Sequence, residues 1–293
     1  MKKIEEIVKI KQFKFLFYFR SILFFSVFSV LFSFYSMAQG NLLITPQRIV
    51  LEGNKQRDEI TLVNSGQDTA YYSISFLQYN MTDDGSFEEV TEPLTGQKFA
   101  DSYVRFFPRS VELAPGESQV VRLQLRRTPN MENGEYRSHL YFRAVPKEKP
   151  LGEEETVSDN NTIGIKLTPI FGISIPVIVR VGDIASSVVL SDVFVHKGEN
   201  QQMPELTLVI NREGEQSVYG DLNVEYISPG GKHFVVGTVR GIAVYTPNSL
   251  RRFSMPLNVP EEVDFSRGKL LVRYGSSSET KAKIFDETEL DLK

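Results

Sequence analysis

The stretch from Thr162 to Val179 constrains the fold most, because it alternates apolar and mixed residues without a break. Every odd position from Ile163 to Val179 is apolar, and a two-residue period indicates a β-strand with one buried face. At about 3.3 Å per residue the run would extend about 55 Å, whereas ordinary strands extend about 17–20 Å. One small domain cannot bury all of that face, so part of it needs another cover.

The chain from Gly40 to this stretch consists of short alternating or β-branched runs separated by turn residues such as Gly53-Asn54 and Pro115-Gly116. Short strands at this spacing, with no convincing amphipathic helix, predict an all-β fold. The expected strands are Leu42–Leu51, Asp58–Asn64, Ala70–Tyr79, Val104–Phe107, Ser110–Leu113, Gln119–Arg126 and Glu135–Val145.

A second group of strands begins near Asp183 and predicts another small β-sandwich. We therefore expect an N-terminal domain at 39–182 and a C-terminal domain at 183–293, in agreement with the usual length of a domain. The expected strands of the second group are Ser187–Val195, Glu205–Asn211, Gly220–Ile227, His233–Val239, Ile242–Val244, Leu250–Leu257, Lys269–Tyr274 and Thr280–Phe285.

Residues 1–38 are typical of a secretory signal peptide. Six basic residues precede or flank an apolar run, and Ser36 and Ala38 form a small-residue cleavage site. The alternative is a retained membrane anchor, but the apolar run Ile22–Tyr35 is short for a span of about 20 residues. We expect cleavage after Ala38, an exported protein, and no stable membrane insertion afterwards.

The composition excludes some classes of partner. Loss of the leader removes six basic and two acidic residues, which moves the net charge from −4 to −8. A mildly acidic exported protein is a poor candidate for binding nucleic acid or anionic lipid. The chain has no Cys, so its domains depend on their cores rather than on disulfides.

The sequence shows no catalytic or metal-binding motif. His139, His196 and His233 do not stand at a metal-ligand spacing, and no nucleophile elbow, P-loop or dinucleotide motif occurs. The run Asn80–Thr91 resembles a calcium loop until its twelfth position, which is Thr91 where a Glu is needed. We expect a hairpin there, and neither an enzyme nor a cofactor-binding protein.

Arg48 is the exceptional charged residue of the first predicted strand, since Ile44, Ile49, Val50 and Leu51 surround it. A guanidinium in such a place needs either water or an anion. The residues alone leave both alternatives open.

Three segments together resemble the periplasmic pilus-assembly chaperones of the chaperone–usher pathway. They are "RIVLEGNKQRDEITLVNSGQDTAYY", "FPRSVELAPGESQVVRLQL" and "NGEYRSHLYFRAVP". The similarity covers roughly Ile44 to Val179, whereas the rest of the chain matches only in being a plausible second sandwich.

This resemblance implies two immunoglobulin-like β-sandwich domains set at an angle, with a cleft between them. The chaperones of the family donate a strand to pilin-like subunits that lack one, so the resemblance implies pilin-like or other β-rich exported subunits as partners, with an outer-membrane usher as a further candidate. Carried over by position, the residue that binds the subunit's terminal carboxylate is Arg48. The donor residues are Ile163, Ile165 and Leu167.

The chain departs from the family in two places. The lysine that accompanies the cleft arginine should fall at Gly172 or Phe171, and Pro169 removes a backbone donor within the strand. We expect Phe171–Val179 to pack inside its own domain, with Ile163–Leu167 as an overhang. The missing lysine favours an alternative, an exported structural or adhesive immunoglobulin-like protein without chaperone activity.

Overall fold

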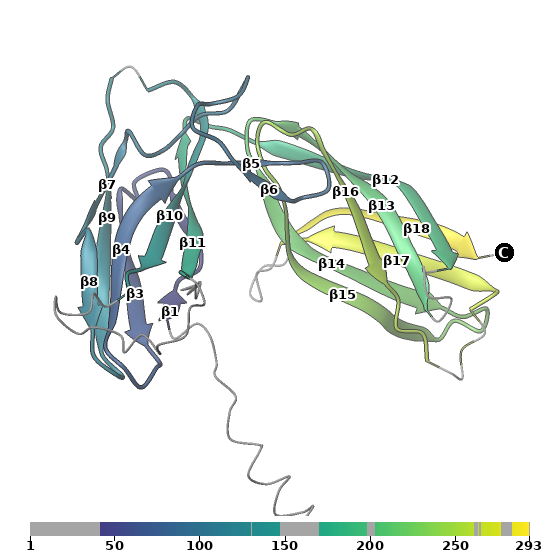
Figure 1. Ribbon diagram of the computed structural model, residues 1–293. Helices are drawn as coiled ribbons and strands as arrows, with labels where there is room; N and C mark the ends of the chain where they lie inside the picture. The colour runs from purple at the N-terminus through teal and green to yellow at the C-terminus, as the bar shows by residue number, and fades with distance from the viewer. Residues whose placement is uncertain are drawn as a thin grey trace, which may run out of the picture. The chain divides into compact units, whose positions relative to one another are not determined.

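The computed structural model describes residues 42–129, 131–146, 170–197, 203–260, 263, 265–276 and 283–292. These residues form strands and connecting turns (Figure 1), which confirms the predicted all-β fold. Within these ranges no helix is long and apolar enough to cross a membrane. The predicted leader, residues 1–38, lies outside the described residues.

Nine strands that end before Asp183 form two sheets. They are β1 (Leu42–Thr45), β2 (Ile49–Leu51), β3 (Arg57–Asn64), β4 (Ala70–Leu77), β7 (Val104–Phe107), β8 (Ser110–Leu113), β9 (Ser118–Leu125), β10 (Gly134–Ala144) and β11 (Gly172–Val181). One sheet has the order β1-β3-β9-β7 and the other the order β2-β11-β10-β4-β8. The first sheet thus matches strands A, B, E and D of an immunoglobulin domain, and β4, β10 and β11 match strands C, F and G.

The predicted first strand, Leu42–Leu51, is wrong because it is two strands in different sheets. β1 pairs with β3, whereas β2 pairs with β11. The bond between Thr45 and Pro46 is cis, and Pro46 has no N–H to donate to a strand ladder. The chain changes sheets at this point, so Arg48 lies directly before β2 and not inside a strand.

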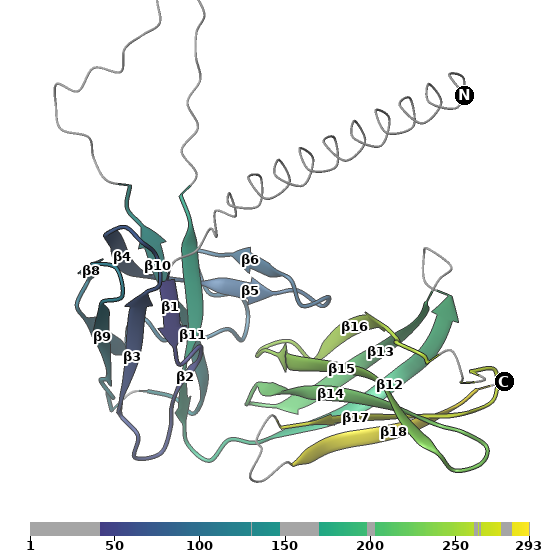
Figure 2. The ribbon, with the colours of Figure 1, turned by 90° about the horizontal axis from the view of Figure 1, so that it is seen from below.

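In the described part of the run predicted as a long strand from Thr162, the strand is β11, which begins at Gly172. The predicted donor residues Ile163, Ile165 and Leu167 lie outside the described residues. β11 pairs antiparallel with β10 along its whole length (Figure 2), but on its other side it pairs with β2 only at Val177–Val179.

The expectation that Phe171–Val179 packs inside its own domain is wrong for the first part of that run. Phe171 and Ile173 are exposed, and burial begins at Ile175. The reason is that the described chain offers no second strand beside this part of β11 to complete the core.

A separate hairpin joins β5 (Tyr79–Met81) and β6 (Phe87–Glu89). The turn between them contains Asp84, which accepts a hydrogen bond from the backbone N–H of Ser86 (2.9 Å). A hairpin rather than a calcium loop was predicted around this Asp-Asp-Gly turn, and the hairpin is confirmed.

The remaining strands form two more sheets, with the orders β12-β13-β16 and β15-β14-β17-β18. They are β12 (Ser186–Lys197), β13 (Pro204–Gly214), β14 (Val218–Ile227), β15 (His233–Val244), β16 (Leu250–Pro256), β17 (Gly268–Gly275) and β18 (Ile284–Leu292). The runs predicted as two strands at His233–Val239 and Ile242–Val244 are the single strand β15.

The last strand was predicted wrongly at Thr280–Phe285, and β18 shares only two residues with that range. β18 is an edge strand rich in acidic residues, so its sequence lacks the apolar signal of a core strand. Its carboxylates face cations of β17 instead, through Glu289 to Lys269 (2.9 Å) and Glu287 to Arg273 (3.0 Å).

Each pair of sheets encloses one hydrophobic core. Residues between 42 and 181 build the first core and residues between 188 and 292 the second. The predicted architecture of two β-sandwiches is therefore confirmed. The predicted domain boundaries stay a prediction, because Leu42–Lys293 forms one compact unit.

Asn64 at the end of β3 ties the following turn to the first sandwich. Its buried amide nitrogen donates to the carbonyl oxygens of Asp68 (2.8 Å) and Leu113 (2.9 Å), and its oxygen accepts from the Gly66 N–H (2.9 Å). Three backbone groups thus depend on one side chain.

We predict that Asn64→Ala lowers the free energy of unfolding by about 2–3 kcal/mol, because buried polar groups lose their partners. Denaturant unfolding measures this change. Asn54→Ala, in an exposed turn, is the control and should change it by less than about 0.5 kcal/mol. Equal effects of the two substitutions would contradict the structural role of Asn64.

Candidate functional site

An apolar surface lies where β11 begins. Ile170, Phe171 and Ile173 are exposed to 44%, 46% and 38%. Phe171 and Ile173 continue the odd-numbered alternation in which the sequence predicted Ile163, Ile165 and Leu167 as donor residues. The predicted donor residues themselves lie outside the described residues, and the apolar surface formed by Ile170, Phe171 and Ile173 follows them in the sequence.

The backbone beside this surface is unpaired on one side. The carbonyl oxygen of Phe171 accepts a hydrogen bond from the N–H of Ala144, which follows Arg143 opposite Gly172 (2.8 Å). Because backbone direction alternates along a strand, Gly172, Ser174 and Pro176 turn their polar groups away from β10. No described strand pairs with that side of Gly172–Pro176, which we call the open edge.

Arg48 stands at the end of the open edge. Ile49 pairs with Val177 in the parallel β2–β11 ladder. Arg48 precedes Ile49 and therefore lies opposite Pro176, the last residue of the open edge. Because the chain changes sheets at Pro46, the predicted carboxylate-binding residue Arg48 lies at the end of the open edge.

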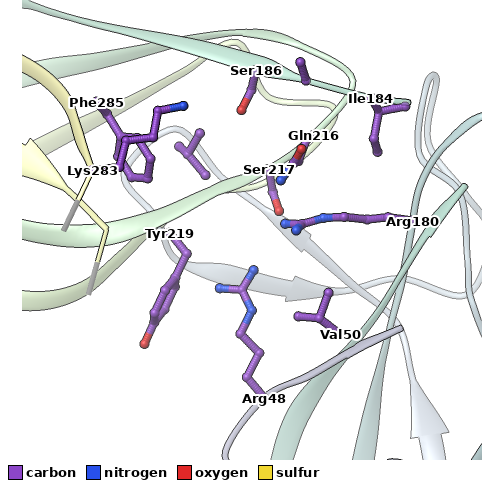
Figure 3. A pocket seen from close by; sticks show the side chains of 12 residues that line it. Arg48, Val50, Arg180, Ile184, Ser186, Gln216, Ser217, Tyr219, Lys283 and Phe285 are labelled. Atoms are coloured by element: carbon purple, nitrogen blue, oxygen red, sulfur yellow. The ribbon is translucent and has the colours of Figure 1, made fainter. Parts of the chain in front are cut away.

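The half-buried Arg48 side chain points into a pocket of about 470 Å³ (Figure 3). We call it the arginine pocket. Its lining contains three cations and no carboxylate. The lining residues are Arg48, Val50, Arg180, Ile184, Ala185, Ser186, Gln216, Ser217, Val218, Tyr219, Lys283 and Phe285.

Arg180 of β11 is neutralised by two carboxylates. Its Nε donates to Glu135 Oε2 (3.1 Å) and its Nη1 donates to Glu52 Oε2 (3.0 Å). Glu135 lies directly opposite Arg180 on β10 and also pairs with Arg137. Arg180 is therefore held in place, and its charge is already balanced.

The Glu135 carboxylate also holds the segment that leads into β14. Glu135 Oε2 accepts hydrogen bonds from the N–H (3.1 Å) and the hydroxyl (2.8 Å) of Ser217. Burial alone would raise the pKa of Glu135, but Arg137, Ser217 and Arg180 together outweigh it and hold that pKa below its ordinary value. The group is thus a buried carboxylate anion.

Arg212 fixes the backbone just before Ser217. Its Nη1 donates to the carbonyl oxygens of Gly214 (2.6 Å) and Gln216 (3.1 Å), and its Nε donates to that of Asn248 (2.8 Å). Because Arg212 is buried, these carbonyls replace water as its partners.

Arg48 differs from Arg180, because no carboxylate of the described residues forms an ion pair with it. Its guanidinium carbon lies 4.4 Å from the centre of the Tyr219 ring. Burial lowers the pKa of Arg48 and the Arg180 charge lowers it further, although Tyr245 and Glu135 act in the opposite direction. Arginine stays protonated in proteins, so the arginine pocket holds a partly desolvated cation that no described carboxylate pairs with.

At Gly172, one of the two places where the family's lysine was expected, any side chain would require the Tyr141 ring to move. A Cβ atom at Gly172 would meet the Tyr141 ring at 2.2 Å. Gly172 is moreover four residues before Pro176, or about 13 Å along the strand, so a side chain there starts far from Arg48. The cations that do line the arginine pocket besides Arg48 are Arg180 and Lys283.

Sequence reasoning missed most of this pocket. Arg180 interrupts an apolar run as Arg48 does, and that signal could have identified it. Ser217, Tyr219 and Lys283 come from a distant part of the chain, and nothing in their local sequence indicates that they lie near Arg48. Among the described residues, no group of His, Asp and Glu side chains could hold a metal ion.

No protein-family model and no curated protein matches the chain. Solved structures match it at low identity. The CsuC–CsuE chaperone–tip adhesion subunit pre-assembly complex of archaic chaperone–usher Csu pili from Acinetobacter baumannii shares 17% identity, with a TM-score of 0.45. The match covers 85% of this chain and 98% of that chain.

Two further structures match in the same way. The CupB2 chaperone of Pseudomonas aeruginosa is 12% identical, with a TM-score of 0.39 over 85% of this chain and 99% of that chain. The Salmonella enterica SafA pilin in complex with the SafB chaperone is 12% identical, with a TM-score of 0.38 over 86% and 96%. At these identities and scores, function has to be argued from the chain's own residues.

We predict that Glu135→Gln lowers the free energy of unfolding at pH 7 by about 2–4 kcal/mol, because it leaves Arg137 and Arg180 without their shared counter-charge. The folded-state pKa of Glu135 is lowered, so its contribution is complete above the unfolded pKa of about 4.3 and is lost as pH falls through the folded pKa.

Denaturant unfolding at a series of pH values tests this dependence. The difference between Glu135→Gln and the unaltered protein should shrink below about pH 4.3. Glu132→Gln removes an exposed carboxylate paired with Lys98 and should have little effect at any pH. A constant difference from pH 7 to low pH would contradict the role assigned to Glu135.

Proposed function

We propose that this protein is a periplasmic chaperone that captures incomplete, pilin-like β-sandwich subunits by donating the edge of β11. One observation carries the proposal. A strand edge that no described strand pairs with, bearing exposed apolar side chains, ends beside Arg48, a half-buried arginine that no described carboxylate pairs with.

The open edge supplies the backbone half of strand addition. Gly172 and Ser174 each present an N–H and a C=O to an added strand. The exposed apolar side chains supply the hydrophobic contacts of strand addition. Burial of Phe171 or Ile173 in a groove of the subunit would stabilise the complex by about 1.5–3 kcal/mol each, before the cost of ordering both partners.

The direction of the added strand follows from the position of Arg48. A strand that runs parallel to β11 along the open edge is collinear with β2 and ends where β2 begins. A terminal carboxylate at that point reaches Arg48, whose guanidinium can bind it with two charge-assisted hydrogen bonds.

Export and partners complete the proposal. Residues 1–38 serve as a cleaved signal peptide, residues 39–182 as the chaperone domain, and residues 183–293 as a second immunoglobulin-like domain. The partners are pilin-like or other β-rich exported subunits, with an outer-membrane usher as the receiver. The mechanism is capture without catalysis or cofactor. It is supported by the basic and apolar N-terminus, the net charge of −8 after cleavage and the open edge.

The second candidate is an exported structural or adhesive protein that keeps the scaffold without capturing subunits. The lack of a lysine at Gly172 or Phe171 favours it. The two candidates differ in what substitution of the open edge does, because only a chaperone needs that surface for subunit capture.

We predict that Ile173→Asp reduces the amount of β-rich subunit that co-purifies with the exported protein at least tenfold. A charge on the open edge cannot be buried in an apolar groove. Quantitative mass spectrometry of the purified complex measures the loss, and circular dichroism checks that the protein stays folded. Val235→Asp places the same charge on an exposed valine of β15 and should leave capture unchanged. Unaltered co-purification with Ile173→Asp would exclude the chaperone function.

We predict that Arg48→Ala weakens binding of a peptide with alternating valines and a free C-terminal carboxylate by about 10–100-fold, the effect of losing hydrogen bonds to a charged group. The same peptide with a C-terminal amide should bind both proteins with equal, weak affinity. Arg105→Ala removes an exposed arginine of β7 and serves as the control in the same calorimetric titration. An unchanged preference for the acid in Arg48→Ala would show that the carboxylate binds elsewhere.

A further inference from the structure

Tyr219 is the described residue whose contact defines where the Arg48 guanidinium lies. The guanidinium carbon is 4.4 Å from the ring centre, and Figure 3 shows the two side chains next to each other at the pocket. Tyr219 is 41% exposed, so core residues do not cover the aromatic face that attracts the cation. A cation over an aromatic ring is stabilised by the ring quadrupole.

The position of Tyr219 follows from the start of β14. Ser217 and Tyr219 are two residues apart and share one face of the extended chain, whereas Val218 between them is buried in the second core. Ser217 bonds to Glu135, which holds Arg180, and Tyr219 contacts Arg48. Three consecutive residues thus set the positions of both pocket arginines.

The ring of Tyr219 is also confined from the side of β15. A Cβ atom at Gly241 would lie 2.9 Å from the Tyr219 hydroxyl oxygen, and Gly241 has a φ of +75°, which suits glycine. The Gly241 N–H donates to the Asp221 carboxylate (2.9 Å). Glycine at this position thus leaves the space that the Tyr219 hydroxyl needs beside β15.

We propose that Tyr219 is a positioning residue that holds the Arg48 guanidinium ready for a carboxylate. This inference rests on the proposed function for the nature of the ligand, a chain-terminal carboxylate. A flexible arginine loses side-chain entropy when it binds an anion. A guanidinium already held against a ring loses less, and its N–H groups remain available at its edge for two parallel hydrogen bonds.

The proposal assigns part of the binding site to the second group of strands. Arg48 belongs to the segment between β1 and β2, but its aromatic partner belongs to β14. The affinity of the pocket for an anion therefore depends on the packing that Glu135 and Ser217 maintain, although neither of these residues touches the anion.

The test compares Tyr219→Leu, which removes the ring, with Tyr219→Phe, which keeps it. Acetate is titrated into protein with ¹⁵N-labelled arginine, and the Arg48 Nε–H resonance, assigned with Arg48→Lys, reports binding. We expect Tyr219→Leu to need about threefold to tenfold more acetate for half-saturation and Tyr219→Phe to match the unaltered protein. Tyr71→Leu, which removes a tyrosine of β4 outside the pocket, is the control.

The same variants are titrated with the acid and amide forms of the alternating valine peptide. We expect Tyr219→Leu to lose affinity for the acid only, whereas a merely structural role would lower affinity for both forms together with the melting temperature. Equal acetate binding by Tyr219→Leu and the unaltered protein would overturn the proposal, and so would an equal loss in Tyr219→Phe. If the unaltered protein binds acid and amide peptides equally while acetate binding still depends on the ring, the proposed function fails and the positioning role stands.

Discussion

The buried carboxylate of Glu135 is the interaction on which the arrangement around the pocket depends. It accepts hydrogen bonds from Arg180 and Ser217 and pairs with Arg137, so one anion joins β10, β11 and the start of β14. A buried ion pair contributes little net stability compared with apolar packing, but removal of one partner costs several kcal/mol. The Glu135 carboxylate therefore determines where Arg180 and Ser217 lie, and these two residues line the arginine pocket together with Arg48.

The second constraint is the passage of the chain from one sheet to the other at Pro46. A continuous first strand would cover one sheet edge only. The break lets β2 seal the C-terminal half of β11 and leaves Gly172–Pro176 open. Unpaired edges favour aggregation, and proteins usually shorten or block them. Among the described residues the open edge is five residues long, Gly172–Pro176, and includes Pro176, which has no N–H to offer.

The sequence was sufficient for the fold wherever the period and the turn residues agreed. β7 and β8 match their predicted ranges residue for residue, β3 differs by one residue at its start, and β9 and β10 differ by one residue at each end. The sequence-based strand predictions were wrong where the pairing between strands, rather than the local sequence pattern, determines the structure. Leu42–Leu51 reads as one strand because periodicity carries no information about which sheet a residue joins. The last strand was predicted at Thr280–Phe285 rather than Ile284–Leu292 because β18 is rich in acidic residues that pair with cations of β17. Arg48 could be identified from its apolar neighbours and a family resemblance. Tyr219 and Ser217 could not, because only tertiary contacts bring them to Arg48 and Glu135.

The proposed strand addition raises a problem of register that the pocket can solve. A one-residue slip of an added strand turns every side chain to the opposite face, and backbone hydrogen bonds alone do not distinguish the two registers. A fixed anion site at the end of the open edge does, because the last residue of the added strand can lie in one place only. That discrimination requires an arginine with a defined position, since a mobile guanidinium would follow the slipped carboxylate. In the proposed complex the contact with Tyr219 supplies this position, so the aromatic ring of β14 would determine the alignment of the side chains that Phe171 and Ile173 meet.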